Sequence, residues 1–148
     1  YLGTKASELA GEDMGKVLYG YLTDVLALND RISVYANDEA DYTEFKIFDF
    51  NFIMLHGHQI NNIQNAIKDL SNTHHKFYDY VILGHTHSLK EYPGGEGQHH
   101  NMEVLVAPSV CGSDPYADKL QVGSKAGMVI FEFDKKYGYT DKHNIILN

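Results

Sequence analysis

Two short apolar runs separated by a helical pattern constrain the fold of this chain more than any other feature. Residues 52–55 and 80–83 are each continuously apolar, which is typical of strands buried on both faces. Between them, over residues 60–71, apolar side chains recur at helical steps with polar residues in between. His56 and His85 are 29 residues apart, close to the length of a βαβ unit. We therefore expect two parallel strands joined by a right-handed crossover.

The rest of the chain is predicted to be mixed, with more strands toward its end. The expected elements are a helix over residues 14–28, a strand over 32–35, a strand pair turning near Asp49 or Asn51, a strand over 102–106, and a hairpin of 127–133 and 137–147 turning at Lys135–Lys136. The stretches "NTHHKFYD" and "PGGEGQHH" are predicted to be loops. This pattern indicates an α/β fold with a largely mixed sheet and a packed hairpin layer.

Composition narrows the class of protein. With 148 residues, 43% hydrophobic and 22% charged, the chain is expected to form one packed domain, residues 1–148. A net charge of −8 argues against a surface built to grip a nucleic-acid backbone, although bound cations would still permit phosphate chemistry. The sequence contains no apolar run that approaches a membrane span. A lone cysteine, Cys111, excludes an intramolecular disulfide and favours a cytoplasmic location.

Histidines directly follow both apolar runs. Because parallel strands end at the same edge of a sheet, His56 and His85 are expected to lie side by side there. His87 either faces the same way as His85 or, if the chain turns, reaches a second ion. Gly57 and Gly84 let the backbone bend and approach a ligand closely. Neutral imidazole binds zinc, iron and manganese, so we predict a metal site formed by the three histidines.

The remaining candidates are weaker, because an isolated His-x-His more often marks an ordinary turn. His58 is interpreted as a supporting residue rather than a ligand, together with Gly57 and Gly84 at the strand ends. The residues expected to be solvated, packed or without a role are His74, His75, His99, His100, His143, Cys111, Asp114, Tyr116 and Asp118. No residue of this chain is predicted with confidence to be catalytic.

At these motifs the chain resembles the C-terminal half of a calcineurin-like metallophosphoesterase. "IMLHGH" resembles the family's strand–His-Gly motif, and "ILGHTH" resembles its Gly-His-x-His motif, within a resemblance that covers about residues 50–133. The small prokaryotic and phage phosphoesterases and the repair nucleases are most similar. The resemblance implies a four-layer αββα sandwich of mixed sheets with flanking helices. It also implies two divalent metals, foremost manganese, with iron, zinc or nickel as alternatives. His56 and His85 would hold one metal and His87 the other.

The implied activity is hydrolysis of phosphomonoesters or phosphodiesters, with nucleotides or nucleic acid as plausible substrates. The family's Asp-x-His, Gly-Asp and Gly-Asn-His motifs do not precede His56, and the one Asp-x-His in the chain is Asp141–Lys142–His143. We therefore expect a fragment that lacks the N-terminal half of its domain and is inactive alone. Three alternatives stay open: a metal-binding or regulatory module without catalysis, a non-metal interaction domain, and self-association through exposed strand edges.

Overall fold

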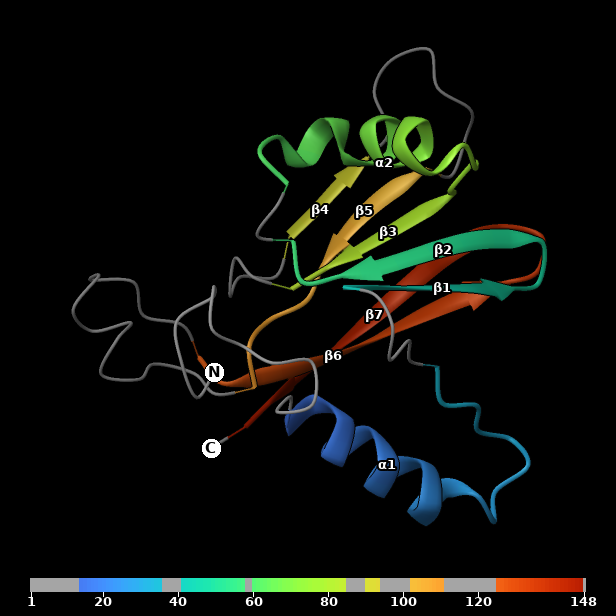
Figure 1. Ribbon diagram of the computed structural model, residues 1–148, viewed down its shortest axis with the longest axis vertical. Coiled ribbons are helices and arrows are strands. Elements are labelled where there is room, and N and C mark those ends of the chain that lie inside the picture. Colours follow the sequence, from blue (N-terminus) through green and yellow to red (C-terminus); the bar gives the residue numbers. More distant parts are fainter. Residues whose placement is uncertain are drawn as a thin grey trace. The chain divides into compact units, whose positions relative to one another are not determined.

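The chain divides into two compact units, each described by itself. The computed structural model describes residues 14–35, 41–57, 60–84, 90–93, 102–110 and 125–147. The first unit is Tyr1–Ala40 and the second is Asp41–Asn148. The first contains helix α1 (Met14–Leu26), and the second contains the sheets and helix α2 (Figure 1). Neither of these helices is long and apolar enough to cross a membrane.

Helix α1 confirms the helix predicted near the start of the chain, and it ends two residues before the predicted boundary. The amide of Asn29 donates to the carbonyl of Leu26 at 2.9 Å, and the Asn29 side chain accepts from the amide of Arg31 at 3.1 Å. The strand predicted over residues 32–35 is wrong, since this segment has no regular structure. A strand needs a partner for its backbone groups, and none of the described strands pairs with this segment.

The second unit is built on a mixed sheet with the strand order β1-β2-β3-β5-β4. Its strands are β1 (Tyr42–Ile47), β2 (Phe50–Leu55), β3 (Tyr80–Leu83), β4 (Lys90–Pro93) and β5 (Glu103–Val106). The β2–β3 and β3–β5 pairs are parallel, whereas β1 and β4 pair antiparallel at the two edges. The predicted parallel pair is therefore confirmed. Strand β4 was not expected from the sequence.

The central strands are buried on both faces, as their apolar runs predicted. On one face, residues such as Ile53, Val81 and Val104 pack under helix α2. On the other face Phe52 and Tyr80 belong to a second cluster, which includes aromatic residues of the C-terminal hairpin. The sheet thus separates two apolar layers, one facing the helix and one facing the hairpin (Figure 1).

The crossover helix begins as a 3-10 turn, Ile63–Asn65, and continues as α2 (Ala66–His74). The Asn62 side chain starts it by accepting the amide of Gln64 at 3.1 Å. The helix ends at His75, whose φ of 52° is left-handed. The predicted loop "NTHHKFYD" is therefore wrong over residues 72–74. Capping at His75 lets the helix run a full turn beyond the last buried leucine.

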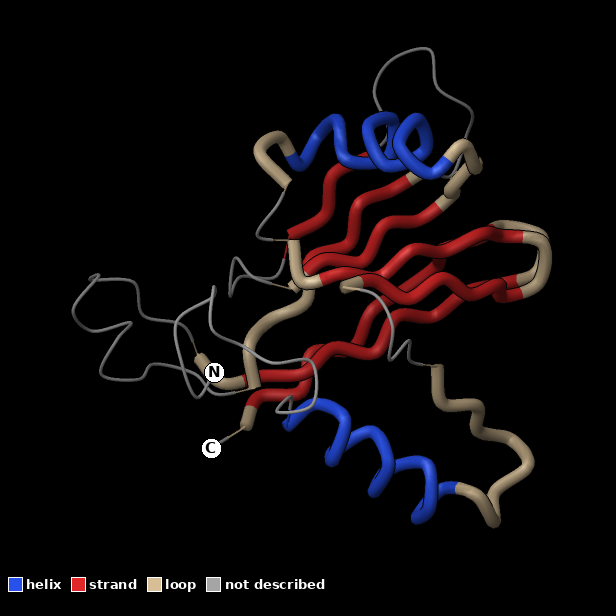
Figure 2. The backbone as a smooth tube through the Cα atoms, in the orientation of Figure 1, coloured by secondary structure: helices blue, strands red, loops and turns tan. Residues whose placement is uncertain are grey.

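The hairpin of β6 (Gly127–Asp134) and β7 (Gly138–Ile146) confirms the predicted C-terminal hairpin. The turn is held by Asp134, whose Oδ1 accepts the amides of Lys136 at 2.7 Å and Tyr137 at 3.0 Å. Figure 2 shows the two strands as a separate ribbon on the sheet face opposite α2. A register shift between Glu132 and Phe133 marks an irregularity in the pairing.

Candidate functional site

The carboxyl ends of β2 and β3 bring His56 and Gly84 together. Leu55 pairs with Leu83 in the parallel register, so the next residue of each strand leaves the sheet at the same edge. A methyl group on Gly84 would lie 3.6 Å from the carbonyl oxygen of His56 and 4.0 Å from its ring Cδ2. A methyl group at position 84 would therefore make ordinary van der Waals contacts with His56, which shows that the two strand ends lie side by side.

The backbone turns sharply directly after His56. Gly57 has a φ of 95°, a conformation that residues with a side chain rarely adopt. Its carbonyl accepts the amide of Ile60 at 3.0 Å, which closes a tight turn ahead of the helix. The His56 side chain is exposed at this edge, whereas Gly57 is buried. The imidazole is thus held on a rigid strand end and is accessible to a ligand.

A third strand contributes to the same edge. After β5, the amide of Ala107 donates to the carbonyl of Leu83 at 2.7 Å, which continues the pairing past the strand end. The carbonyl of Ser109 then accepts the amide of Gly127 at 2.9 Å, where β6 begins. Residues 107–109, which leave β5, therefore lie beside the end of β3 and are hydrogen-bonded to the start of the hairpin.

Three predicted site residues, His58, His85 and His87, lie outside the described part of the chain. The same holds for six residues for which no role was expected: His99, His100, Cys111, Asp114, Tyr116 and Asp118. His85 is the residue that follows Gly84 in the sequence. The roles predicted for His56, His85 and His87 as ligands, and for His58, Gly57 and Gly84 as their support, stay predictions.

A cavity of about 480 Å³ lies beside the end of β2, between the start of β1 and α2. Leu55, Ile60 and Leu70 supply apolar lining, and Asp41 and Asp69 supply carboxylates. His74, which was expected in a loop, also lines it from the end of α2, and its ring lies edge-on to Tyr42 with 4.6 Å between centroids. The helix extends far enough to place this histidine against the first strand, which the loop prediction had excluded.

Three described residues with shifted pKa values lie in packing contacts of the main sheet. Hydrogen bonds from Lys76 and then Tyr78 lower the pKa of Glu44. Burial, followed by the hydrogen bond to Glu44, raises the pKa of Tyr78. Burial likewise raises the pKa of Tyr80. These phenols are therefore neutral structural groups, and the carboxylate is charged.

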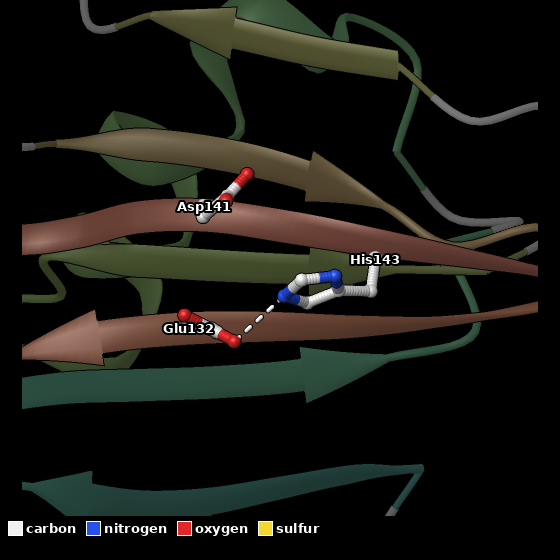
Figure 3. A group of neighbouring side chains, drawn as sticks. All are labelled: Glu132, Asp141 and His143. Carbon is white, nitrogen blue, oxygen red and sulfur yellow. Dashed lines mark hydrogen bonds and ion pairs between the residues drawn. The ribbon is translucent and has the colours of Figure 1, made fainter.

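A second group of ligand-type side chains lies on the hairpin (Figure 3). Glu132 on β6 and Asp141 and His143 on β7 each offer one ligand atom, and these atoms lie within 4.8 Å of one another. His143 Nε2 lies 2.7 Å from Glu132 Oε1. No role was predicted for His143, because the pairing that joins it to Glu132 depends on the hairpin register. The alternation Asp141–Lys142–His143 within a predicted strand was the available signal.

No family model matches the sequence. The chain is 40% identical over 145 residues to the SPbeta prophage-derived uncharacterized protein YonJ of Bacillus subtilis (strain 168). That match covers 98% of this chain and 36% of YonJ, so the chain spans about a third of the length of this relative.

Solved structures share the arrangement of strands and helices. Vps29 from Entamoeba histolytica, solved as a double mutant, matches with a TM-score of 0.54 at 19% identity, over 93% of this chain and 79% of that one. A novel archaeal phosphodiesterase matches with a TM-score of 0.51 at 22% identity, over 92% of this chain and 64% of that one. The chain thus has the mixed α/β fold of these two structures. At such low identity the likeness is one of fold alone.

Proposed function

We propose that this chain is the C-terminal, metal-binding portion of a metallophosphoesterase that hydrolyses phosphomonoesters or phosphodiesters, with nucleotides or nucleic acid as the substrate class. The observation that carries the proposal is the contact of His56 with Gly84 at the ends of two parallel strands. In such sheets ligands bind beyond the carboxyl ends of the strands. The likeness in fold to an archaeal phosphodiesterase supports the same reading.

The described residues fit a metal ligand at this edge. His56 is exposed and follows a strand buried on both faces, so its backbone is held rigidly while its ring can reach an ion. Gly57 turns the chain away, and Gly84 leaves space beside the imidazole. His85 and His87 follow Gly84 in sequence and complete a set of three imidazoles. Such a set suits manganese, iron, zinc or nickel.

In this proposal the chain supplies half of a two-metal site. A bound pair of divalent ions would supply Lewis-acid stabilisation of the phosphoryl oxygens and a hydroxide nucleophile at neutral pH. His56, His85 and His87 hold and orient the ions from the strand ends. The bridging carboxylate and the remaining ligands would come from the N-terminal half of the domain, outside this chain. We therefore propose that the chain alone is inactive.

A metal-binding or regulatory module without catalysis is the second candidate. The observation that favours it is the likeness in fold to Vps29 from Entamoeba histolytica. Both candidates need the strand-end histidines to bind metal, and they differ only in whether the complete domain turns over a substrate. A non-metal interaction domain would need neither property.

Metal binding and hydrolysis together test these proposals. We expect the chain to bind Mn²⁺ and to lose the equivalents held at the strand ends when His56, His85 and His87 are all replaced by alanine. The control His75→Asn removes a described histidine elsewhere and suits its left-handed backbone. Unchanged Mn²⁺ affinity in the triple variant would favour the non-metal interaction domain.

Hydrolysis of bis-p-nitrophenyl phosphate with added Mn²⁺ separates the enzyme from the regulatory module. We expect the chain alone to show no turnover above background, and a chain extended by the missing half of the domain to show turnover. Activity of the chain alone that His87→Ala abolishes would contradict the proposed inactivity. An extended chain that binds Mn²⁺ without turnover would support the regulatory module.

A further inference from the structure

We propose that Glu132, Asp141 and His143 form a zinc site on the exposed face of the β6–β7 hairpin. The three side chains come from two neighbouring strands, and one ligand atom of each lies within 4.8 Å of the other two (Figure 3). This group is separate in sequence and in structure from His56, which follows β2 in the other sheet. The proposal is therefore independent of the function proposed for the strand ends.

The hairpin register places the three groups on one face. Glu132 stands directly opposite Asp141, and His143 lies two residues further along β7. Side chains two residues apart on a strand point the same way. On the opposite face, the rings of Phe131 and Phe133 pack against the aromatic cluster of the main sheet. The backbone that carries the three ligands is thus held by a packed layer beneath it.

The spacing of the ligand atoms requires only small side-chain movements for zinc to bind. Oxygen and nitrogen ligands at about 2.1 Å from a tetrahedral ion lie about 3.4 Å from one another. Here Glu132 Oε1 and His143 Nε2 are 2.7 Å apart, and all three ligand atoms lie within 4.8 Å. The side chains of Glu132 and His143 are 54% and 55% exposed, so they can rotate without disturbing the core.

The charges also favour a cation at this point. Like charges placed directly opposite one another on antiparallel strands destabilise the pair, and Glu132 and Asp141 are so placed. Within the described ranges, neither carboxylate forms an ion pair with a lysine or arginine. Lys142 donates its backbone amide to Asp141 Oδ1 at 2.7 Å and stands opposite Phe131 in the register. A divalent ion between the strands would neutralise both carboxylates.

The donor set selects the class of ion. One imidazole and two carboxylates suit a transition-metal dication, whereas Mg²⁺ and Ca²⁺ prefer oxygen ligands throughout. Zinc accepts three protein ligands of this kind and takes water in the fourth position. The exposed position leaves room for that water. When zinc binds, we expect it to link β6 to β7 next to the register shift that follows Glu132.

Zinc stoichiometry in the full chain tests the site. The measurements use a background in which His56, His85 and His87 are replaced by alanine, so that the strand-end histidines cannot contribute. In this background we expect one equivalent of Zn²⁺ to bind. Glu132→Gln combined with His143→Ala should abolish this binding or weaken the Zn²⁺ affinity at least tenfold, because losing even an outer-shell partner commonly lowers metal affinity 10–100-fold. His75→Asn serves as the matched control and should leave the affinity unchanged.

Two outcomes would overturn the site: no zinc binding in the background protein, or unchanged stoichiometry and affinity in the Glu132/His143 variant. Circular dichroism checks that each variant folds, and all three side chains are exposed, so their replacement is expected to preserve the fold. Anomalous scattering at the zinc edge from crystals of the background protein gives a second readout. A peak between Glu132, Asp141 and His143 supports the proposal, and a peak only elsewhere contradicts it.

Discussion

The hydroxyl of Tyr80 accepts a hydrogen bond from the backbone amide of Tyr139 at 2.8 Å. Tyr80 lies on β3 and is 0% exposed, and Tyr139 lies on β7 in the other sheet. Since burial raises the pKa of Tyr80, the phenol is neutral and remains a stable partner for the amide. This bond therefore joins the hairpin to the sheet that carries His56.

Replacing Tyr80 by phenylalanine removes that bond and keeps the ring packing. We expect the free energy of unfolding to fall by about 1–2 kcal/mol, the usual range for a lost buried hydrogen bond. Urea unfolding measures the change. The control is Tyr137→Phe, whose exposed hydroxyl should contribute less than about 0.5 kcal/mol. Equal stability of Tyr80→Phe and wild type would show that the bond does not hold the two sheets together.

Phe133 is the aromatic residue through which the hairpin packs on the sheet. Its ring lies edge-on to Phe52 at 4.9 Å and to Tyr80 at 5.0 Å between centroids. We expect Phe133→Ala to lower the free energy of unfolding by about 2–4 kcal/mol, because the ring leaves a cavity between the two layers. Phe77→Ala, at a side chain that is 50% exposed, should cost much less. Similar losses in urea unfolding for both variants would contradict this packing role.

The two glycines at the strand ends should respond differently to alanine. Gly57 has a φ of 95°, so Gly57→Ala is expected to destabilise the chain by about 1–2 kcal/mol through backbone strain. At Gly84 the added methyl would meet His56 at ordinary contact distances of 3.6 and 4.0 Å, so the cost should stay below about 1 kcal/mol. Thermal unfolding of the matched pair measures the difference. A larger loss for Gly84→Ala would refute this explanation.

Glu44 should make stability depend on pH in the acid range. Its carboxylate accepts the Tyr78 hydroxyl, and the Lys76 ammonium lies 2.5 Å away. These contacts lower its pKa below the ordinary value of 4.5. The Glu44 carboxylate then binds a proton less readily in the folded state than in the unfolded chain. The stabilisation is present above pH 4.5 and is lost as the pH falls through the lowered value.

Glu44→Gln tests this dependence. The neutral amide does not titrate, so the variant should lose less stability than wild type when the pH falls from about 6 to about 3. Urea unfolding at several pH values measures both curves. Lys46→Gln, on the same strand, provides a control that leaves the Glu44 contacts in place. Parallel curves for Glu44→Gln and wild type would mean that the carboxylate contributes nothing to the acid response.

The elements that were predicted correctly are those in which the pattern of apolar residues in the sequence already shows which side chains are buried. The apolar runs of β2 and β3 are buried on both faces and led directly to the parallel pair and its shared edge. The hairpin alternates strictly between inward and outward residues along β6. Asp134 begins its turn with a side-chain contact that depends only on neighbouring residues. The local sequence pattern and short-range hydrogen bonds are enough to predict such elements.

The features that were missed depend on contacts between distant residues. Strand β4 exists through its pairing with β5, and residues 32–35 remain irregular without a strand partner among the described elements. The end of α2 places His74 against Tyr42, a residue far from it in the sequence. A polar or short segment has no intrinsic preference strong enough to determine its secondary structure, so its contacts with distant residues determine it.

The sequence by itself determined that two apolar strands end in histidine and glycine at one sheet edge, because periodicity and spacing specify a parallel crossover. The tertiary structure alone decided that the exposed His56 lies beside Gly84. It alone also brought Glu132 opposite Asp141 and beside His143. That grouping depends on the register between two strands, which the turn at Asp134 fixes and the packing of the hairpin's inner face on Phe52 and Tyr80 supports.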